Sequence, residues 1–150
     1  MNASNEKELI CLGIESTAHT FGVGIASSFG KIVANINSTY KPPSQGGIHP
    51  REAAQHHCDV APNVLKKALQ KSIKGTESLD AIAFSFGPGL GPVLRVGATV
   101  ARTLAVWLNK PLVPVHHAIA HIELASLTTG ANDPLVILVS GGHTSIVAYA

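Results

Sequence analysis

Three short apolar runs separated by tight polar turns open the chain, and helix-like and strand-like segments alternate after them. Short apolar runs bounded by Gly, Ser or Thr are typical of buried β-strands, whereas apolar residues three and four apart indicate helices. The strand-like runs cover residues 9–14, 22–26, 31–37, 79–86 and 112–115, and the helix-like segments cover 50–71, 93–108 and 116–127. This order predicts an α/β fold whose first three strands form an antiparallel meander.

The β-β-β-α-β-α-β-α order is that of the ribonuclease H-like fold, which sugar kinases, actin and Hsp70-type ATPases share. Those proteins duplicate the unit and bind nucleotide in the cleft between the two copies. We therefore expect a ribonuclease H-like lobe of the actin and Hsp70 type. Within the first helical segment, Pro62 has no amide hydrogen, which predicts either a kink or two shorter helices.

Composition excludes several classes of protein. Hydrophobic residues make up 45% of the chain and charged residues 13%, which excludes a disordered chain, and the net charge of +2 does not by itself indicate nucleic-acid binding. The N-terminus lacks an apolar signal-peptide region, and Arg95, Arg102 and several Gly and Pro residues interrupt the longest apolar stretches, so we expect no membrane span. Cys11 and Cys58 lack metal-ligand spacing, which favours reduced cysteines in a cytoplasmic protein.

A shift of 124 positions reveals a weak internal repeat, in which residues 18–26 lie over residues 142–150. The identical pairs are His19 and His143, Thr20 and Thr144, Val23 and Val147, and Ala26 and Ala150. Both copies read as strand, small polar turn, strand, and this shared context supports duplication. We therefore predict a first lobe over residues 1–131 and the opening hairpin of a second lobe over 132–150, with the remainder of that lobe absent from this sequence.

Two glycine-rich segments could approach a ligand closely. The turn at Ser140, Gly141 and Gly142 can present backbone amides to phosphate oxygens, although an ordinary hairpin turn has the same composition. The segment GPGLGP at 87–92 lacks the Gly-Lys-Ser/Thr ending of a P-loop, and its prolines remove amide donors. We expect it to be a structural turn that starts the following helix.

The segment VHHAIAHIEL carries the strongest candidate site. His117 and His121 are four residues apart and lie on one face of a helix, where two imidazole nitrogens can bind one ion. His116 is rotated away from them. Ala118 stands where a metalloprotease of the H-E-x-x-H type needs its glutamate, so peptide hydrolysis is disfavoured. The pair forms an incomplete site that needs further ligands.

The remaining histidines carry weaker predictions. His49, His56 and His57 do not point to a common position along the first helix, and we expect surface or core roles for them. His19 and His143 lie in the paired turns, where they could contact phosphate or substrate or act as hydrogen-bonded turn residues.

Five segments in order resemble the universal tRNA threonylcarbamoyladenosine transferase family, whose archaeal and eukaryotic members are the catalytic subunit of the KEOPS complex. They are GIESTAHTFGVGIA, GGIHPREAAQHH, FGPGLGP, VHHAIAHIE and LVSGGHT. The resemblance implies transfer of a threonylcarbamoyl group from threonylcarbamoyl-adenylate to the adenosine next to the anticodon of tRNA. It also implies a two-lobed fold in which the adenylate, or an ATP-like nucleotide, is a ligand.

The same resemblance implies a set of site residues and partners. His117 and His121 would bind one iron or zinc ion. The substrate-binding strand and turn would consist of Leu138, Val139, Ser140, Gly141 and Gly142. Archaeal and eukaryotic members usually carry tyrosine, a further metal ligand, where this chain has Leu138. The partners would be tRNA, a small dimerising subunit on the helices of the first lobe, and a kinase subunit.

Two alternatives to the transferase remain at this point. Family members were once described as glycoprotein-cleaving metallopeptidases, which Ala118 disfavours. The chain could instead be a non-catalytic module that binds a partner through the apolar face of residues 52–69, although packing on its own sheet is the default. We expect the 150 residues by themselves to be inactive as a transferase.

Overall fold

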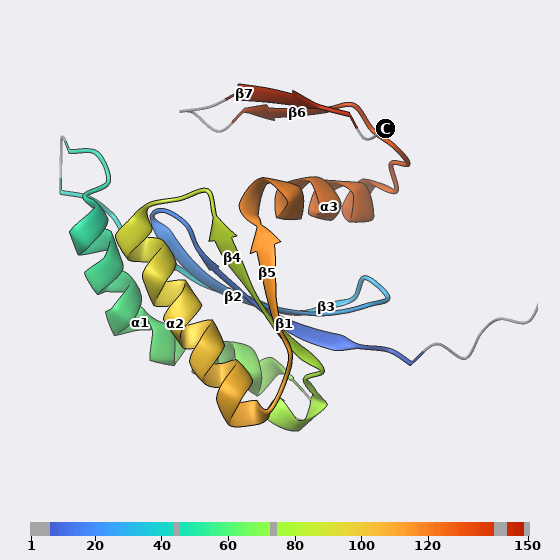
Figure 1. Ribbon diagram of the computed structural model, residues 1–150, viewed down its shortest axis with the longest axis horizontal. Coiled ribbons are helices and arrows are strands. Elements are labelled where there is room, and N and C mark those ends of the chain that lie inside the picture. Colours follow the sequence, from blue (N-terminus) through green and yellow to red (C-terminus); the bar gives the residue numbers. More distant parts are fainter. Residues whose placement is uncertain (1–6, 44–45, 73–74, 140–143, 149–150) are drawn as a thin grey trace, which may run out of the picture.

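The computed structural model describes residues 7–43, 46–72, 75–139 and 144–148. A five-stranded sheet has the order β3-β2-β1-β4-β5, and a second sheet contains β6 and β7 (Figure 1). The elements are β1 (Ile10–Ser16), β2 (Thr20–Ser27), β3 (Ile32–Thr39), α1 (Pro50–Lys71), the 3-10 helix η1 (Gly75–Ser78), β4 (Ala81–Gly87), α2 (Gly91–Leu108), β5 (Leu112–His116), α3 (His117–Thr129), β6 (Val136–Val139) and β7 (Thr144–Val147).

The first three strands are antiparallel neighbours, whereas β1, β4 and β5 run parallel to one another. Both parallel connections pass through a helix, as parallel pairing requires. This arrangement confirms the predicted α/β fold of the ribonuclease H-like class. It also brings the carboxyl ends of β1, β4 and β5 to the same edge of the sheet.

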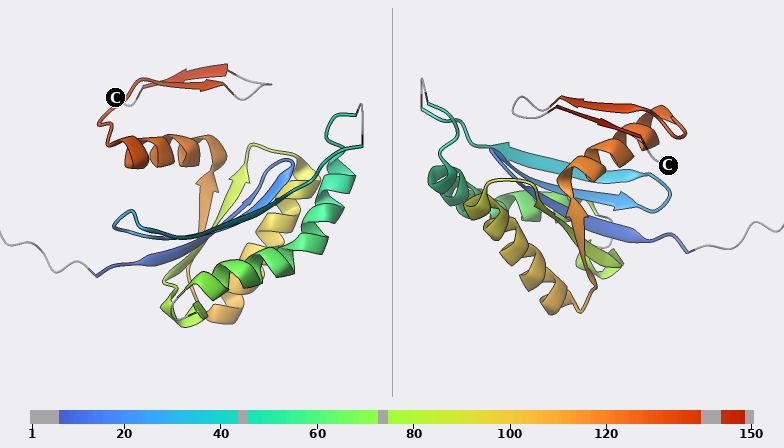
Figure 2. Two further views of the ribbon diagram at one scale, coloured as in Figure 1. Left: turned by 180° about the vertical axis from the view of Figure 1, so that it is seen from behind. Right: turned by 45° about the horizontal axis from the view of Figure 1, so that its top comes forward.

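One face of the sheet carries the hydrophobic core. Leu12, Phe21 and Ile25 have exposed fractions of 0–1%, and they alternate with residues that point to the other face. Helices α1 and α2 cover the core face, while α3 lies on the opposite side of the sheet (Figures 1 and 2). Small residues of α2, including Gly97 and Ala101, allow that helix to approach the strands.

The segment around Pro62 forms one helix, α1, so the prediction of two shorter helices is wrong and that of a kink remains. Figure 2 shows α1 bent rather than broken. Pro62 is on the exposed side of the helix, where water can satisfy the backbone carbonyl that loses its hydrogen bond.

The predicted hairpin near the end of the chain is confirmed, because β6 and β7 pair antiparallel. Its register differs from that of the first hairpin. Val23 pairs with Ile14, but Val147 pairs with Val136 rather than with Leu138, the residue 124 positions after Ile14. The repeat therefore preserves the hairpin but shifts its pairing by two residues. The assignment of this hairpin to a second lobe stays a prediction.

Both cysteines are free, and Cys11 is half-buried whereas Cys58 is exposed. Within the described part of the chain, no helix has the length and apolarity needed to cross a membrane.

Candidate metal-binding site

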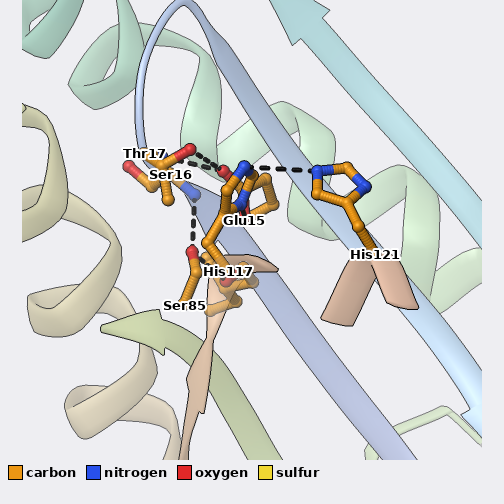
Figure 3. Close-up of polar contacts among 7 residues, drawn as sticks. Glu15, Ser16, Thr17, Ser85, His117 and His121 are labelled. Atoms are coloured by element: carbon orange, nitrogen blue, oxygen red, sulfur yellow. Dashed lines mark hydrogen bonds and ion pairs between the residues drawn. The ribbon is translucent and has the colours of Figure 1, made fainter. Parts of the chain in front are cut away.

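His117 and His121 lie in the first turns of α3 with their rings turned toward each other (Figure 3). Their Nε2 atoms are 3.2 Å apart, and the ring planes are nearly perpendicular, at 86°. The structure thus brings together the two histidines whose spacing suggested a common face. Their role as metal ligands stays a prediction.

Glu15, at the end of β1, contacts the other nitrogen of His117. The distance from His117 Nδ1 to Glu15 Oε2 is 3.1 Å, and the two side chains are 31% and 37% exposed. The residues are 102 positions apart in the sequence. They meet because β1 and β5 run parallel and end at the same edge of the sheet, and α3 starts directly after β5.

Sequence reasoning did not identify Glu15 as a site residue. A signal for it existed. In open α/β sheets, ligand sites form outside the carboxyl ends of the strands. A carboxylate at the end of one parallel strand and a histidine just after another are therefore expected to be close.

The turn after β1 holds Glu15 in place. The Thr17 backbone amide donates to Glu15 Oε1 at 2.9 Å, and the Thr17 hydroxyl donates to the same oxygen. Ser16 anchors the strand end, because its amide donates to Ser85 Oγ at 3.2 Å and its hydroxyl donates to the Val93 carbonyl at 2.8 Å. Figure 3 shows Glu15, Ser16 and Thr17 grouped beside His117.

The spacing of the two Nε2 atoms is that of a hydrogen bond between the rings, and it also fits a shared ion. Two Zn–N bonds at a tetrahedral angle place their nitrogens about 3.3 Å apart, close to the observed 3.2 Å. Metal-bound histidines commonly donate their second ring N–H to a carboxylate, the position that Glu15 occupies. Among the described residues, no group of three or more His, Cys, Asp or Glu side chains is placed to hold an ion. Binding of an ion by this pair therefore stays a prediction.

A groove of about 360 Å³ lies between α3 and the sheet face that α1 and α2 do not cover. Its floor contains Gly13, Gly22 and Gly24, and Ala120 and Leu124 of α3 form a wall. Since glycine has no side chain, the sheet surface is open there, and Glu15 lines the same groove. The histidine pair thus sits beside a concave surface of a size typical of ligand sites.

The predicted substrate-binding strand is only partly within the described residues. Leu138 and Val139 belong to β6, where they pair with Ser145 and Thr144 and are half-buried and exposed, respectively. Ser140, Gly141 and Gly142 lie outside the described residues, as does His143. The binding role of this segment stays a prediction.

The other histidines lie in different surroundings. His116 directly precedes α3 and makes no side-chain hydrogen bond to the helix, and its ring contacts Phe86 at a centroid distance of 5.8 Å. His57 is fully buried against Phe21, which confirms a core role, and burial together with the neighbouring His56 lowers its pKa. His19 is exposed, and its backbone carbonyl accepts a hydrogen bond from the Tyr40 amide.

The GPGLGP segment is the structural turn that the sequence predicted, since α2 begins at Gly91 within it.

Comparison with known proteins identifies the family of this chain. Residues 31–150 match the family described as TsaD: tRNA N6-adenosine threonylcarbamoyltransferase. The chain belongs to the TsaD family. The resemblance inferred from the five motifs is thereby confirmed.

Archaeal relatives of the same name are similar along nearly the whole chain. The tRNA N6-adenosine threonylcarbamoyltransferase of Caldivirga maquilingensis is 62% identical over 142 residues, which cover 95% of this chain and 43% of the relative. That of Thermofilum pendens is 58% identical over 143 residues, or 95% of this chain and 42% of the relative. This TsaD-family chain therefore spans about two fifths of the length of these curated relatives.

Among solved structures, YeaZ from Pseudomonas aeruginosa has a similar fold. The TM-score is 0.58 at 18% sequence identity, covering 93% of this chain and 64% of that chain. The similarity supports the fold assignment alone.

Proposed function

We propose that this TsaD-family protein transfers a threonylcarbamoyl group from threonylcarbamoyl-adenylate to the adenosine next to the anticodon of tRNA. Family membership supports the reaction class, and the facing Nε2 atoms of His117 and His121 are the observation that supports this site. Because the curated relatives are more than twice as long, we propose that activity needs a chain of their length and that the 150 residues alone are inactive.

We propose that His117 and His121 bind one divalent iron or zinc ion. The 3.2 Å separation of the nitrogens and the carboxylate behind His117 support this assignment. Such an ion would supply Lewis-acid chemistry and orient the threonylcarbamoyl group through its oxygens. Glu15 accepts a hydrogen bond from the Nδ1–H of His117, which leaves the Nε2 lone pair available as a ligand.

The reaction we propose is direct attack by the RNA amine. The exocyclic nitrogen of adenosine forms a bond to the carbamoyl carbon, and the bond from that carbon to the adenylate phosphate oxygen breaks. Adenosine monophosphate leaves with the electron pair of that bond, and the amine releases its proton to solvent. Near the histidine pair, the Ser16 hydroxyl donates to the Val93 carbonyl and the Ser85 hydroxyl to the Ile14 carbonyl. These hydroxyls are occupied in packing, which supports a route without a covalent enzyme intermediate. Isolation of an enzyme–threonylcarbamoyl adduct would contradict it.

The test uses His117→Ala and His121→Ala in protein from the complete reading frame, with His49→Ala, an exposed residue before α1, as the matched control. We measure modified adenosine on tRNA supplied with threonylcarbamoyl-adenylate, and bound metal by mass spectrometry. Loss of a metal ligand is expected to lower the rate by more than the roughly 10-fold to 100-fold that loss of a residue behind a ligand costs, with the control unchanged. Wild-type rates in both variants would refute the assigned site.

We also propose that α1 and α2 bind the small dimerising subunit of a KEOPS-like complex. Val106 and Trp107 of α2 are 82% and 73% exposed, which is unusual for large apolar residues and typical of interfaces. Trp107→Ala should weaken co-purification with that subunit without altering metal binding. Unchanged co-purification would argue against this surface.

We also propose a cytoplasmic location, which fits an enzyme that modifies tRNA.

A further inference from the structure

Gly89 and Leu90 pack directly beneath the turn that follows β1. The Leu90 amide donates to the Thr17 carbonyl at 2.8 Å. A Cβ atom at Gly89 would lie 2.5 Å from the Thr17 carbonyl oxygen and 2.9 Å from Thr17 Cα. Only glycine allows such an approach without a shift of backbone. The segment is therefore in close contact with the turn whose Thr17 donates hydrogen bonds to Glu15.

The two oxygens of the Glu15 carboxylate have different partners, Thr17 and His117. The Thr17 amide and hydroxyl both donate to Oε1, which leaves Oε2 facing Nδ1 of His117 at 3.1 Å. Thr17 is 5% exposed, so little room exists for the turn to rearrange. The orientation of the carboxylate thus depends on the position of Thr17, which in turn depends on Gly89 and Leu90.

A carboxylate only accepts hydrogen bonds, and a neutral imidazole carries a single ring proton. Glu15 therefore selects the tautomer of His117 that has its proton on Nδ1. We propose that Gly89 and Leu90 are positioning residues that act through Thr17 and Glu15 to hold His117 with an unprotonated Nε2 directed at His121. This assigns to part of the GPGLGP segment a function other than starting a helix.

This positioning role serves the proposed metal site and therefore rests on the proposed function. The tautomer of His117 can nevertheless be measured in metal-free protein. The test compares Gly89→Ala with Gly91→Ala in the protein from the complete reading frame. Neither glycine has a left-handed backbone, and a Cβ at Gly91 would have no atom within 4 Å, so it is a matched control. Nitrogen-15 NMR of the histidine rings reports which ring nitrogen carries the proton, and titration with Zn²⁺ reports affinity.

Gly91→Ala should keep the Nδ1-protonated form of His117 and wild-type Zn²⁺ affinity. Gly89→Ala should give a mixture of tautomers and weaken Zn²⁺ binding by roughly 10-fold to 100-fold, the usual effect of losing a partner behind a ligand. A folded Gly89→Ala protein with a wild-type ring spectrum would overturn the proposal.

Thr17→Val provides a second variant in case Gly89→Ala fails to fold. It removes the hydroxyl donor to Glu15 Oε1 and keeps the backbone amide, so a smaller shift toward mixed tautomers is expected. An unchanged spectrum in Thr17→Val would likewise overturn the inference. If wild-type protein binds no metal, the proposed function fails while the tautomer measurement still tests the positioning role.

Discussion

The two faces of the five-stranded sheet use the same strands for different purposes. On the face covered by α1 and α2, Phe21, Val23 and Ile25 of β2 are almost completely buried. On the other face, the residues between them include Gly22 and Gly24, and a groove remains beneath α3. Alternation along one strand thus places large apolar side chains on one side and glycine on the other.

The difference separates stability from chemistry. The core face excludes water and buries most of the apolar surface, which is the main favourable contribution to folding. The open face ends at Glu15 and the histidine pair, where side chains are partly exposed and hydrogen-bonded. Changes on the first face should therefore alter the free energy of unfolding, and changes on the second should alter metal binding.

Adjacent residues of β2 give the largest contrast. Phe21→Ala should lower the free energy of unfolding by about 3–5 kcal/mol, because it leaves a cavity in a fully buried site. Gly22→Ala should change it by less than about 1 kcal/mol, since the new Cβ makes only ordinary contacts, the closest 3.6 Å from Glu15 Cβ. Urea denaturation measures both. Equal effects would break the proposed contrast between the faces.

A substitution at the contact between α2 and the end of β1 should lower the free energy of unfolding by less than Phe21→Ala does. Gly97→Ala would place a Cβ 2.6 Å from Ser16 Cβ, and the resulting overpacking should cost about 1–3 kcal/mol. Thr99→Ala, at an exposed position of the same helix, should stay within about 0.5 kcal/mol. Thermal unfolding monitored by circular dichroism compares the two. A neutral Gly97→Ala would show that helix and strand can separate without loss of packing.

Burial of His57 predicts a pH dependence of the core face. Burial, followed by the nearby His56, lowers the pKa of His57 in the folded state. Below about pH 6.5 the unfolded chain therefore binds more protons than the folded one, and the free energy of unfolding falls as pH falls. Denaturation at pH 7.5 and 5.5 should show this loss in wild type, a smaller loss in His57→Gln, and the wild-type loss in the exposed control His49→Gln. An undiminished loss in His57→Gln would assign the effect to other groups.

The smallest change in stability is expected at the histidine pair itself. His121→Ala should shift the metal-free free energy of unfolding by less than about 0.5 kcal/mol because its side chain is exposed. His117→Ala should lower it by about 0.5–1.5 kcal/mol because the half-buried ring loses its hydrogen bond to Glu15. Zn²⁺ at about 100 times its dissociation constant should stabilise wild type by about 2.7 kcal/mol and the variants by much less. Calorimetry with and without Zn²⁺ measures both quantities. Equal stabilisation of the variants would place the metal elsewhere.

Much of the fold was predictable, because local patterns report local structure. The apolar runs located every strand of the main sheet to within a few residues, and the three helices followed from helical spacing. Pro62 was ambiguous because a proline breaks one hydrogen bond in any helix, and whether the helix continues depends on packing along its other face. The shifted register of β6 and β7 could not be predicted from the internal repeat either. Identities between two segments of the chain do not specify which residues pair across a hairpin.

The candidate site was likewise predictable only in part. The spacing of His117 and His121 was sufficient to place them on one face of a helix, because helix geometry relates residues four apart. The contact with Glu15 depended on the parallel pairing of β1, β4 and β5, which no local pattern contains. The close approach of Gly89 to Thr17 likewise required the structure, since a glycine-rich segment is compatible with many turns.

The sequence by itself determined the order of elements, the family and the histidine pair, because these depend on residues near one another along the chain. The tertiary structure alone showed that Glu15 lies behind His117 and that Gly89 and Leu90 lie behind Thr17. Those contacts join residues roughly 70 to 100 positions apart. They exist only when the strands pair in one order, since that order decides which strand ends share an edge.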